Sequence, residues 1–397
     1  MGGAETSLIE LLASVRTARP KWHLSLVLGA DGPLAGRATA LGVSVHVLPM
    51  PPAMARLGDS SAKKRLPLLS GLPAAALYVR RLARAVRAER PDLIHATGFK
   101  MHLLSAWTRP RRTPLIWHIH DYVQSRPVMS RLLRWHAGQC AAAIVNSKSV
   151  GSDVRMALGQ DLRVETIYNA IDLRRFSPDG AMVDLDALSG LPQAEPGTIR
   201  VGLVATFAHW KGHLTFLKAL AMIPPEARVR GYIIGGAIYQ TIGSQHSLDD
   251  LRLEAVRLGL GNRLGFTGFV DDTASAMRAL DIVVHASTSP EPFGMVIVEG
   301  MACGKPVIAS EAGGAMELFE DGVDALGHPP NDAFALASQI ARLAHDEQLR
   351  ARIGRAGREK AEAAFKRDRL ALELTAIYQQ FCDRLPRTGA VALSARY

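Results

Sequence analysis

The chain has 397 residues, more than one hydrophobic core usually serves, since single cores stop growing near about 250–300 residues; we therefore expect two domains. Its 48% hydrophobic content indicates a globular protein, and no apolar run reaches the roughly eighteen residues of a membrane span. The net charge of +10 is concentrated in residues 1–175, which hold 25 Lys and Arg against 11 Asp and Glu. Aromatic residues make up only 6%, which argues against nucleic acid and leaves an anionic membrane or substrate as the partner of the basic half.

The chain begins with Gly2 and Gly3 in front of a helix that has Leu8 and Leu12 on one face. A glycine pair before a helix lets backbone amides approach a phosphate closely, although a flexible terminus is the simpler interpretation. No basic-then-apolar signal pattern is present, and the three cysteines are far apart and lack metal-ligand spacing. We therefore expect reduced thiols and a cytoplasmic protein.

Two strands follow at residues 24–28 and 43–48, and then a strongly basic stretch at residues 61–90. This stretch ends in a helix whose basic residues are Arg80, Arg81, Arg84, Arg87 and Arg90. A basic amphipathic helix can lie on an anionic lipid leaflet, where each basic residue adds about 1 kcal/mol. A solvated face above a core stripe is the equal alternative.

Three further strands are predicted at residues 92–96, 114–118 and 141–146, with histidines near two of their ends. His118 and His120 would point to the same side of their strand, and His95 lies in the preceding one. A metal site is disfavoured, because no third ligand has convincing spacing. For His95 and His118, a purely structural role as buried, hydrogen-bonded histidines remains the alternative to a functional one.

The second half begins after residues 177–198, whose Pro, Gly, Asp and Ala predict a linker. A strand at 199–205 leads to Lys211 and Gly212, just before a helix that starts near residue 214. A cation and a helix N-terminus meet there, which suits a diphosphate. Strands at 231–236 and 266–270 follow.

Residues 281–304 form the most informative stretch. A buried strand over 281–286 is followed by a Ser, Thr and Pro turn and an apolar helix over 295–302. Glu291 lies on the turn and Glu299 in the helix, with seven residues between them. Loops at the carboxyl ends of strands are where open α/β sheets bind ligands, and the amides at the helix start attract anions.

The chain ends with a strand at 306–310, a Gly313-Gly314 turn, a helix starting at Glu317, and helices over 350–364 and 370–385. Strands and helices alternate throughout, which predicts parallel, doubly wound sheets.

Glu-x7-Glu within EPFGMVIVEGMACGKPVIAS, followed by Gly313-Gly314 and Glu317, resembles the retaining glycosyltransferases of family four. The resemblance extends over nearly the whole chain and implies the GT-B fold, in which two Rossmann-like domains face each other across a cleft. The implied first domain is residues 1–178 plus about 370–397, with a crossing C-terminal helix, and the second is 179–369. In the family, a strand precedes the Gly-Gly turn; here we expect that first strand, a central one, to be absent.

The resemblance also implies roles for individual residues. His120 would lie near the donor sugar and acceptor, Glu291 would bind sugar hydroxyls, and Glu299 the ribose. The remaining donor-binding residues are expected to be Gly2, Gly3, Thr206, Lys211, Gly212, Phe269, Val270, Phe293, Gly294, Met295 and Val296. Thr206 replaces an arginine that the family commonly carries five residues before the lysine, so one phosphate cation is missing or supplied elsewhere.

We therefore expect a metal-independent retaining glycosyltransferase that needs no cofactor. Its nucleotide-sugar is a substrate, and its acceptor would be a glycan or glycolipid of the cell surface. We expect it in the cytoplasm, peripheral on the inner face of the cell membrane if the basic half binds lipid, and not on nucleic acid. The alternatives are a nucleotide-sugar epimerase or a phosphorylase on the same fold, or a non-catalytic, membrane-associated assembly partner.

Overall fold

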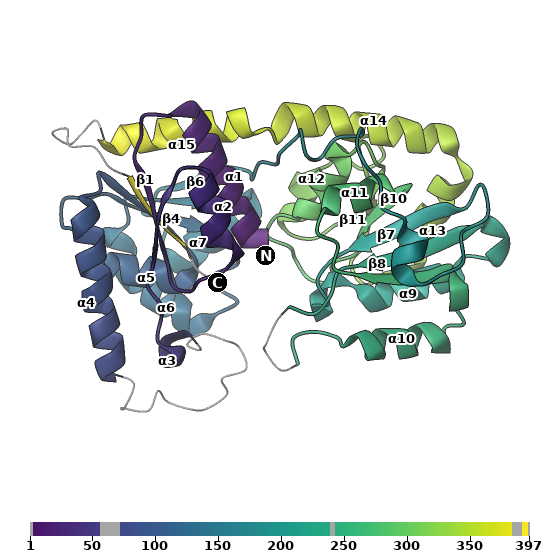
Figure 1. Cartoon of the computed structure of the whole chain (residues 1–397), viewed down its shortest axis with the longest axis horizontal. Coiled ribbons are helices and arrows are strands. Elements are labelled where there is room, and N and C mark those ends of the chain that lie inside the picture. Colours follow the sequence, from purple (N-terminus) through teal and green to yellow (C-terminus); the bar gives the residue numbers. More distant parts are fainter. Residues whose placement is uncertain (1–2, 56–71, 239–242, 383–390, 396–397) are drawn as a thin grey trace. The chain divides into compact units, whose positions relative to one another are not determined.

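The computed structural model describes residues 3–55, 72–238, 243–382 and 391–395. The chain divides into two compact units, Met1–Ala170 with Arg367–Tyr397, and Ile171–Lys366 (Figure 1). The first break falls before the predicted residue 178, because Ile171 belongs to the second unit. Its N–H donates to the Phe365 carbonyl over 2.9 Å, and it forms a parallel bridge with Lys366.

The first unit contains a fully parallel sheet of seven strands among its described residues, in the order β2-β1-β13-β3-β4-β5-β6. The strands are β1 (Leu24–Leu28), β2 (Ser44–Val47), β3 (Leu93–Thr97), β4 (Leu115–Ile119), β5 (Ala142–Val145), β6 (Val164–Thr166) and β13 (Val391–Ala395). β1, β3, β4 and β5 are buried at every position, as expected for parallel strands that are covered on both faces.

An interior position of this sheet, the third of the seven, is filled from the far end of the chain. β13 pairs in parallel with β1 on one side, Leu24 opposite Val391, and with β3 on the other, Leu93 opposite Val391. The gap expected from the family pattern is therefore occupied, by a segment that the sequence did not suggest as a strand.

Helices cover both faces of this sheet. They are α1 (Gly3–Ala18), α2 (Pro33–Ala40), α3 (Pro52–Ala55), α4 (Leu72–Glu89), α5 (Phe99–Thr108), α6 (Pro127–His136), α7 (Lys148–Leu158) and α15 (Arg367–Cys382). One core joins α1, α2 and α15 to one face, and another joins α4, α5, α6 and α7 to the opposite face. Figure 1 shows α1 and α2 in front of the sheet and α5 and α6 behind it.

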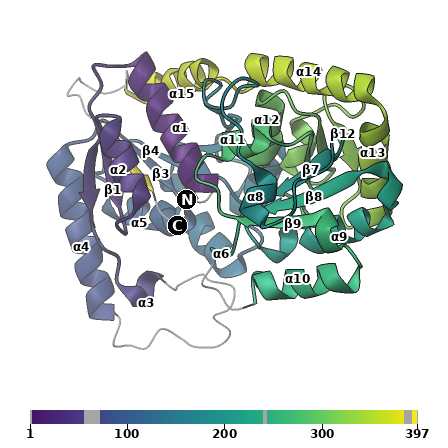
Figure 2. The same ribbon diagram turned by 45° about the vertical axis from the view of Figure 1, so that its right-hand side comes forward.

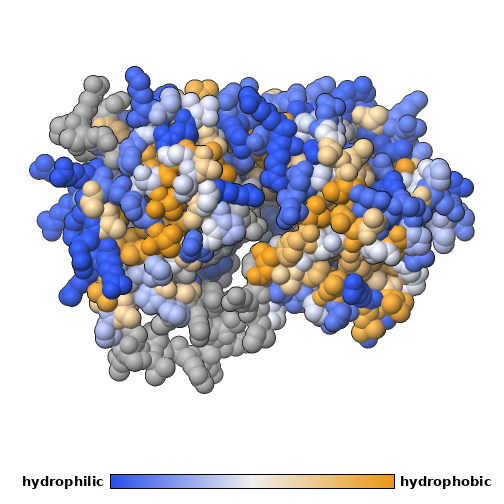
Figure 3. All heavy atoms as spheres, in the orientation of Figure 1, coloured by the Kyte–Doolittle hydropathy of each residue, from blue (hydrophilic) through white to orange (hydrophobic). Residues whose placement is uncertain are grey.

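α4 uses its apolar stripe within the core. Tyr78, Leu82 and Val86 are buried against α5 and the sheet, whereas its arginines are exposed. The surface over α4 is accordingly hydrophilic in Figure 3. The structure thus matches the solvated face over a core stripe, and this helix offers charge to a lipid surface but little apolar area.

The second unit contains a parallel sheet of six strands among its described residues, in the order β12-β11-β10-β7-β8-β9. The strands are β7 (Ile199–Val204), β8 (Val229–Ile234), β9 (Leu264–Gly268), β10 (Ile282–His285), β11 (Val307–Ser310) and β12 (Leu326–His328). Its helices are α8 (Leu185–Ser189), α9 (His213–Met222), α10 (Leu248–Arg257), α11 (Thr273–Arg278), α12 (Met295–Ala302), α13 (Ala333–His345) and α14 (Glu347–Ala364).

Two sequence-based expectations for this unit were wrong. Residues 177–198 are not a free linker, because they contain α8, which lies against the sheet of the second unit beside β9 (Figure 2). Asp186 accepts hydrogen bonds from Arg230 and Tyr232, each over 2.6 Å, which compensate the burial of its charge. Glu317 does not begin a helix; it ends a short 3-10 turn, Gly314–Glu317.

No helix among the residues that the structure describes combines the length and the apolar character that crossing a membrane requires.

Candidate functional site

Lys211 is held at the carboxyl end of the second sheet by a turn with tight backbone packing. The 3-10 turn His209–Lys211 leads into Gly212, which has φ +76° and precedes α9. A side-chain carbon on Gly212 would lie 1.8 Å from the Ala286 carbonyl oxygen, so only glycine fits. The Thr288 N–H also donates to the Trp210 carbonyl over 2.7 Å. These contacts fix the lysine turn against the loop that follows β10.

Glu291 is the residue that this loop presents to Lys211. Its backbone is anchored at the end of β11, where the Gly314 N–H donates to the Glu291 carbonyl over 2.7 Å. Its carboxylate forms an ion pair with the Lys211 ammonium and accepts a hydrogen bond from Ser287. The structure therefore joins two residues that are eighty positions apart and that the sequence had assigned to different parts of the donor.

His285 completes the contacts of this carboxylate. Its Nε2 lies 3.0 Å from Glu291 Oε2, and its Nδ1 accepts the Ser310 backbone N–H over 3.3 Å. Because a backbone N–H can only donate, the proton of the neutral ring must be on Nε2, where it donates to Glu291. Ser310 Oγ in turn donates to the Ser287 carbonyl over 2.6 Å. His285, Ser287, Ser310 and Glu291 thus form a closed ring of hydrogen bonds.

The charge balance keeps Glu291 ionised. Burial by itself raises the pKa of its carboxyl, but the charge of Lys211 and the hydrogen bonds from His285 and Lys211 outweigh it and hold the pKa well below its usual range. Lys211 retains 22% exposure of its side chain and Glu291 12%. The pair thus lies at the carboxyl end of the sheet, where a polar ligand can reach it. Each of its two charges already has a partner.

α12 begins directly after this loop, at the left-handed Gly294 with φ +105°. Phe293 is buried, and its ring stacks edge-to-face on Phe365 at 6.0 Å, so its side chain belongs to the core. The half-exposed residues of the helix are Met295, Val296 and Glu299. The second acid of the motif therefore lies on the solvent-facing side of α12 together with two of the predicted donor residues.

The other predicted residues of this unit lie at the ends of neighbouring strands. Thr206 follows β7, and its hydroxyl is buried without a hydrogen-bond partner in the part of the chain that the structure describes. Phe269 and Val270 follow β9, and the exposed Phe269 ring covers Gly236, where a side-chain carbon would come within 2.7 Å of it.

In the first unit, His120 follows β4 at the end of a column of buried imidazoles. The Tyr378 hydroxyl lies 2.7 Å from His95 Nδ1, and His95 Nε2 lies 3.1 Å from His118 Nδ1. The rings of His118 and His120 overlap, with centroids 3.9 Å apart. Over the described residues, His118 Nε2 and His120 Nδ1 are buried and without a partner.

These imidazoles are neutral. Burial lowers the pKa of His95 to about 3 and that of His120 to about 4, and it holds the pKa of His118 well below the usual value. His120 can therefore exchange hydrogen bonds with a hydroxyl group but does not supply a positive charge near pH 7.

Gly3 opens α1 and is exposed, whereas Gly2 lies outside the described residues. Within the described ranges, no group of three or more His, Cys, Asp and Glu side chains is arranged to hold a metal ion. Metal independence stays a prediction.

The sequence analysis predicted Lys211, Glu291 and His120 as site residues. It assigned no role to His285, Ser287, Ser310 and Tyr378, which the structure joins to Glu291 or to the histidine column. A histidine at the end of a buried strand was the available signal for His285. Its partner on the next strand was not visible, because the register of β10 against β11, Val284 opposite Ile308, is a property of the folded sheet.

Two family models match the chain, one over its N-terminal half and one over most of the second unit. Residues 1–175 match the model described as Glycosyltransferase Family 4, and residues 193–360 match Glycosyl transferases group 1. N-acetyl-alpha-D-glucosaminyl L-malate synthase of Bacillus anthracis is 25% identical over 75% of this chain and 77% of that protein. The lipopolysaccharide core biosynthesis glycosyltransferase LpsE of Rhizobium meliloti is 30% identical over 49% of this chain, and the match spans about half of that protein, 54%.

Among solved structures, that of Anabaena Alr3699/HepE in complex with UDP-glucose superimposes with a TM-score of 0.78, at 29% sequence identity over 96% of each chain. A structure of the same protein in complex with UDP and glucose gives a TM-score of 0.77.

Proposed function

The chain belongs to glycosyltransferase family four and has the GT-B fold, as the sequence predicted, and from that premise we propose that it is a retaining glycosyltransferase. It transfers a sugar from a nucleotide-sugar donor to an acceptor hydroxyl and keeps the anomeric configuration. The bond between the anomeric carbon and the donor phosphate breaks, and a bond to the acceptor oxygen forms on the same face. The acceptor proton passes to the departing phosphate oxygen.

The observation that carries this proposal is the Lys211–Glu291 pair at the end of β10. A nucleoside diphosphate is the kind of anion that can take over the ammonium of Lys211, since it carries more charge than one carboxylate. The carboxylate of Glu291 is then left to its hydrogen bonds with His285 and Ser287 and is available to sugar hydroxyls. The Lys211 ammonium is then already in place to stabilise the leaving diphosphate, so no side chain has to move at the moment of reaction.

The other residues have supporting roles. Glu299 accepts hydrogen bonds from the ribose hydroxyls, and the backbone at the start of α12 orients the sugar. His120, neutral because burial lowers its pKa to about 4, bonds to the sugar or to the acceptor hydroxyl. We assign no carboxylate as a covalent nucleophile. We therefore favour direct attack by the acceptor hydroxyl on the face of the sugar from which the phosphate departs.

The chemistry of the relatives narrows the substrates. The Anabaena structure contains UDP-glucose, so UDP-sugars are the first donors to test. Relatives in lipopolysaccharide core biosynthesis support a cell-surface glycan or glycolipid as acceptor. A lipid-linked acceptor fits a cytoplasmic enzyme that works at the inner face of the cell membrane.

Donor binding is the direct test. We would titrate UDP, GDP and ADP, and then their sugars, into the protein by calorimetry. Lys211→Ala should lower the affinity for the tightest-binding nucleoside diphosphate at least about tenfold, as expected for loss of a charge-assisted contact. Lys218→Ala is the matched control, since Lys218 is exposed on the same helix α9 that Lys211 precedes. Unchanged affinity in Lys211→Ala would refute the phosphate role.

Product analysis separates the remaining alternatives. A new glycoside with the donor's anomeric configuration supports transfer with retention. Conversion of the donor sugar without acceptor would indicate an epimerase, and dependence on free phosphate a phosphorylase. Failure to bind any nucleoside diphosphate would favour a non-catalytic assembly partner. Complete loss of activity in EDTA would contradict metal independence.

A further inference from the structure

The amino edge of the first sheet, opposite to the end that carries His120, has an unusual surface. α5 and α6 run back along the parallel sheet and both end at this edge, next to the start of β4. We call this surface the basic edge and define it by Trp107, Arg111, Arg112, Arg131, Arg134 and Trp135.

Two indole rings are exposed on the basic edge. Trp135 is 83% exposed and Trp107 50%, although side chains of this size are normally well covered. Both rings contact His136: Trp107 Nε1 donates to its Nε2 over 3.0 Å, and Trp135 stacks against it. The two indoles are thus held together at one place and not scattered over the surface.

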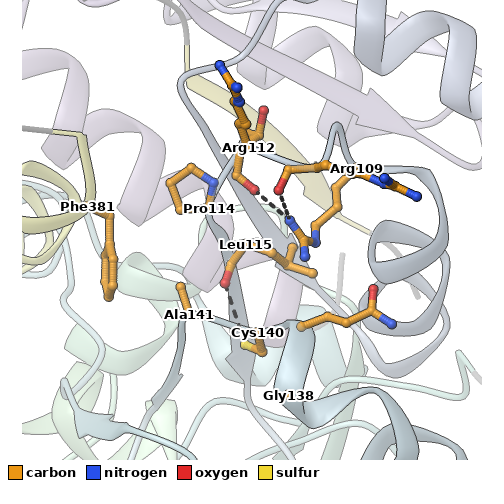
Figure 4. Close-up of a pocket in the computed structure, with 11 residues that line it drawn as sticks. Arg109, Arg112, Pro114, Leu115, Gly138, Cys140, Ala141 and Phe381 are labelled. Atoms are coloured by element: carbon orange, nitrogen blue, oxygen red, sulfur yellow. Dashed lines mark hydrogen bonds between the residues drawn. The ribbon is translucent and has the colours of Figure 1, made fainter. Parts of the chain in front are cut away.

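A shallow pocket of about 310 Å³ continues this surface. His136 Nδ1 lies 3.0 Å from the amide of Gln139, which lines the pocket together with Arg111 and Arg112. Figure 4 shows Arg109 and Arg112 at this pocket, with Leu115 and Phe381. Arg109 donates to the carbonyls of Arg111 and Thr113 and so fixes the turn that carries both arginines. Leu115 and Phe381 supply apolar lining, and none of the described lining residues is acidic.

The charges of the basic edge are unpaired. The guanidinium groups of Arg111, Arg112, Arg131 and Arg134 are exposed and have no hydrogen bond or ion pair to any residue that the structure describes. Arg126, at the other end of the same helix α6, is paired with Asp121 over 3.2 Å. Helix dipoles favour some positive charge at a helix end, but they do not account for the exposed indoles.

We propose that the basic edge docks the protein on an anionic lipid bilayer. The unpaired guanidinium groups would bind lipid phosphates, with one headgroup in the pocket beside Arg111 and Arg112, and the two indoles would enter the interfacial layer. Tryptophan prefers that layer because its ring is apolar and its N–H polar, and clustered basic residues are drawn to anionic leaflets. α4 adds positive charge alongside α5 but lacks an anchor, since its apolar stripe is already in the core.

The test uses the full chain and sedimentation with two kinds of vesicle, phosphatidylcholine alone and phosphatidylcholine with about 30% phosphatidylglycerol. Binding should require the anionic lipid. Arg131→Glu with Arg134→Glu should reduce the bound fraction at least about tenfold, because each basic residue near the leaflet contributes about fivefold. The matched control is Arg252→Glu with Arg355→Glu, the same charge change at two exposed arginines of the second unit.

Trp135→Ser tests the anchor separately and should reduce binding about threefold or more. We expect the tryptophan emission of the wild type to shift to the blue on vesicles, and this shift should be lost in the variant. Its control is Val256→Ser, because Val256 is 75% exposed on α10 in the second unit. Circular dichroism and thermal unfolding of each variant verify that it is folded.

Several outcomes would overturn the proposal. They are equal binding to both vesicle types, wild-type binding by the Arg131 and Arg134 variant, or a loss of binding in Arg80→Glu with Arg84→Glu on α4 that exceeds the loss at the basic edge. A salt-dependent shift on RNA or DNA without any vesicle binding would assign the surface to nucleic acid instead.

Discussion

The two units present their candidate site residues at the carboxyl ends of similar parallel sheets, yet the two sets differ in charge and in how well they are paired. In the first unit, His95, His118 and His120 form a neutral column in which two buried ring nitrogens lack a partner among the described residues. In the second, Glu291 is ionised and surrounded by Lys211, His285 and Ser287. The first arrangement suits hydrogen bonding to neutral hydroxyls, and the second suits exchange of one anion for another.

The largest expected effect comes from removing the charge at the centre of the second set. Glu291→Ala should lower turnover about 100-fold or more while leaving nucleoside diphosphate binding intact or tighter, because Lys211 is then released from its carboxylate partner. Steady-state kinetics and calorimetry on the same preparation measure both quantities. Glu311→Ala, on the loop after the neighbouring strand β11, is a control for acid removal at this edge. An unchanged rate in Glu291→Ala would show that turnover does not depend on the charged set of the second unit.

Gly212→Ala tests whether the Lys211 turn must touch the end of β10. The new side-chain carbon would lie 1.8 Å from the Ala286 oxygen in a left-handed conformation, so we expect about 2–4 kcal/mol of lost stability and loss of nucleotide binding. Gly259→Ala is the control, because Gly259 also has a positive φ, +67°, but open space around it; it should cost only about 1–2 kcal/mol. If urea unfolding gave the same loss of stability for both variants, Gly212 and the Ala286 carbonyl would not be in close contact in solution.

Acid should weaken the first unit through its imidazole column. In the folded protein the pKa of His95 is about 3 and that of His120 about 4, both below the unfolded value of 6.5, so their contribution is present above pH 6.5 and is lost as pH falls from there toward 4. At pH 5 this amounts to about 2 kcal/mol for each histidine. Hydrogen exchange at pH 7 and pH 5 should show faster opening of β3 and β4. A first unit as stable at pH 5 as at pH 7 would contradict neutral, buried rings.

The smallest effect is expected from Tyr378→Phe, which removes the hydroxyl at the inner end of the column. His95 Nδ1 would lose its 2.7 Å partner while buried, at a cost of about 1–2 kcal/mol. In a His95→Leu background the same change should be nearly neutral, and urea unfolding of the four proteins completes the double-mutant cycle. Additive effects would show that the contact does not stabilise the column.

Local patterns in the sequence predicted most elements of the fold and failed where distant segments meet. Residues 24–28 and 295–302 were predicted with the observed bounds, because a buried strand and an apolar helix ended by glycine have strong local signals. α8 was taken for a linker, since the two closest partners of Asp186, Arg230 and Tyr232, lie more than forty positions away. A composition rich in turn residues cannot reveal such a partner.

For the candidate site, too, single residues could be predicted from local sequence, whereas the contacts between them could not. Lys211 and Glu291 could be predicted as site residues because each lies in a recognisable turn before a helix. That they form an ion pair could not, because it depends on β7 and β10 being neighbours in the sheet. His120 could be identified as an end-of-strand residue, whereas Tyr378 reaches His95 from a helix that is 283 positions further along the chain.

The placement of β13 has a consequence for biosynthesis. A strand with neighbours on both sides cannot be added last to a finished sheet without leaving β1 and β3 apart until it arrives, and its partner Leu24 is synthesised hundreds of residues earlier. The second unit, Ile171–Lys366, is continuous and can close while translation proceeds. During the last part of synthesis, β1 and β3 therefore each have one strand edge without its native partner until β13 has been made.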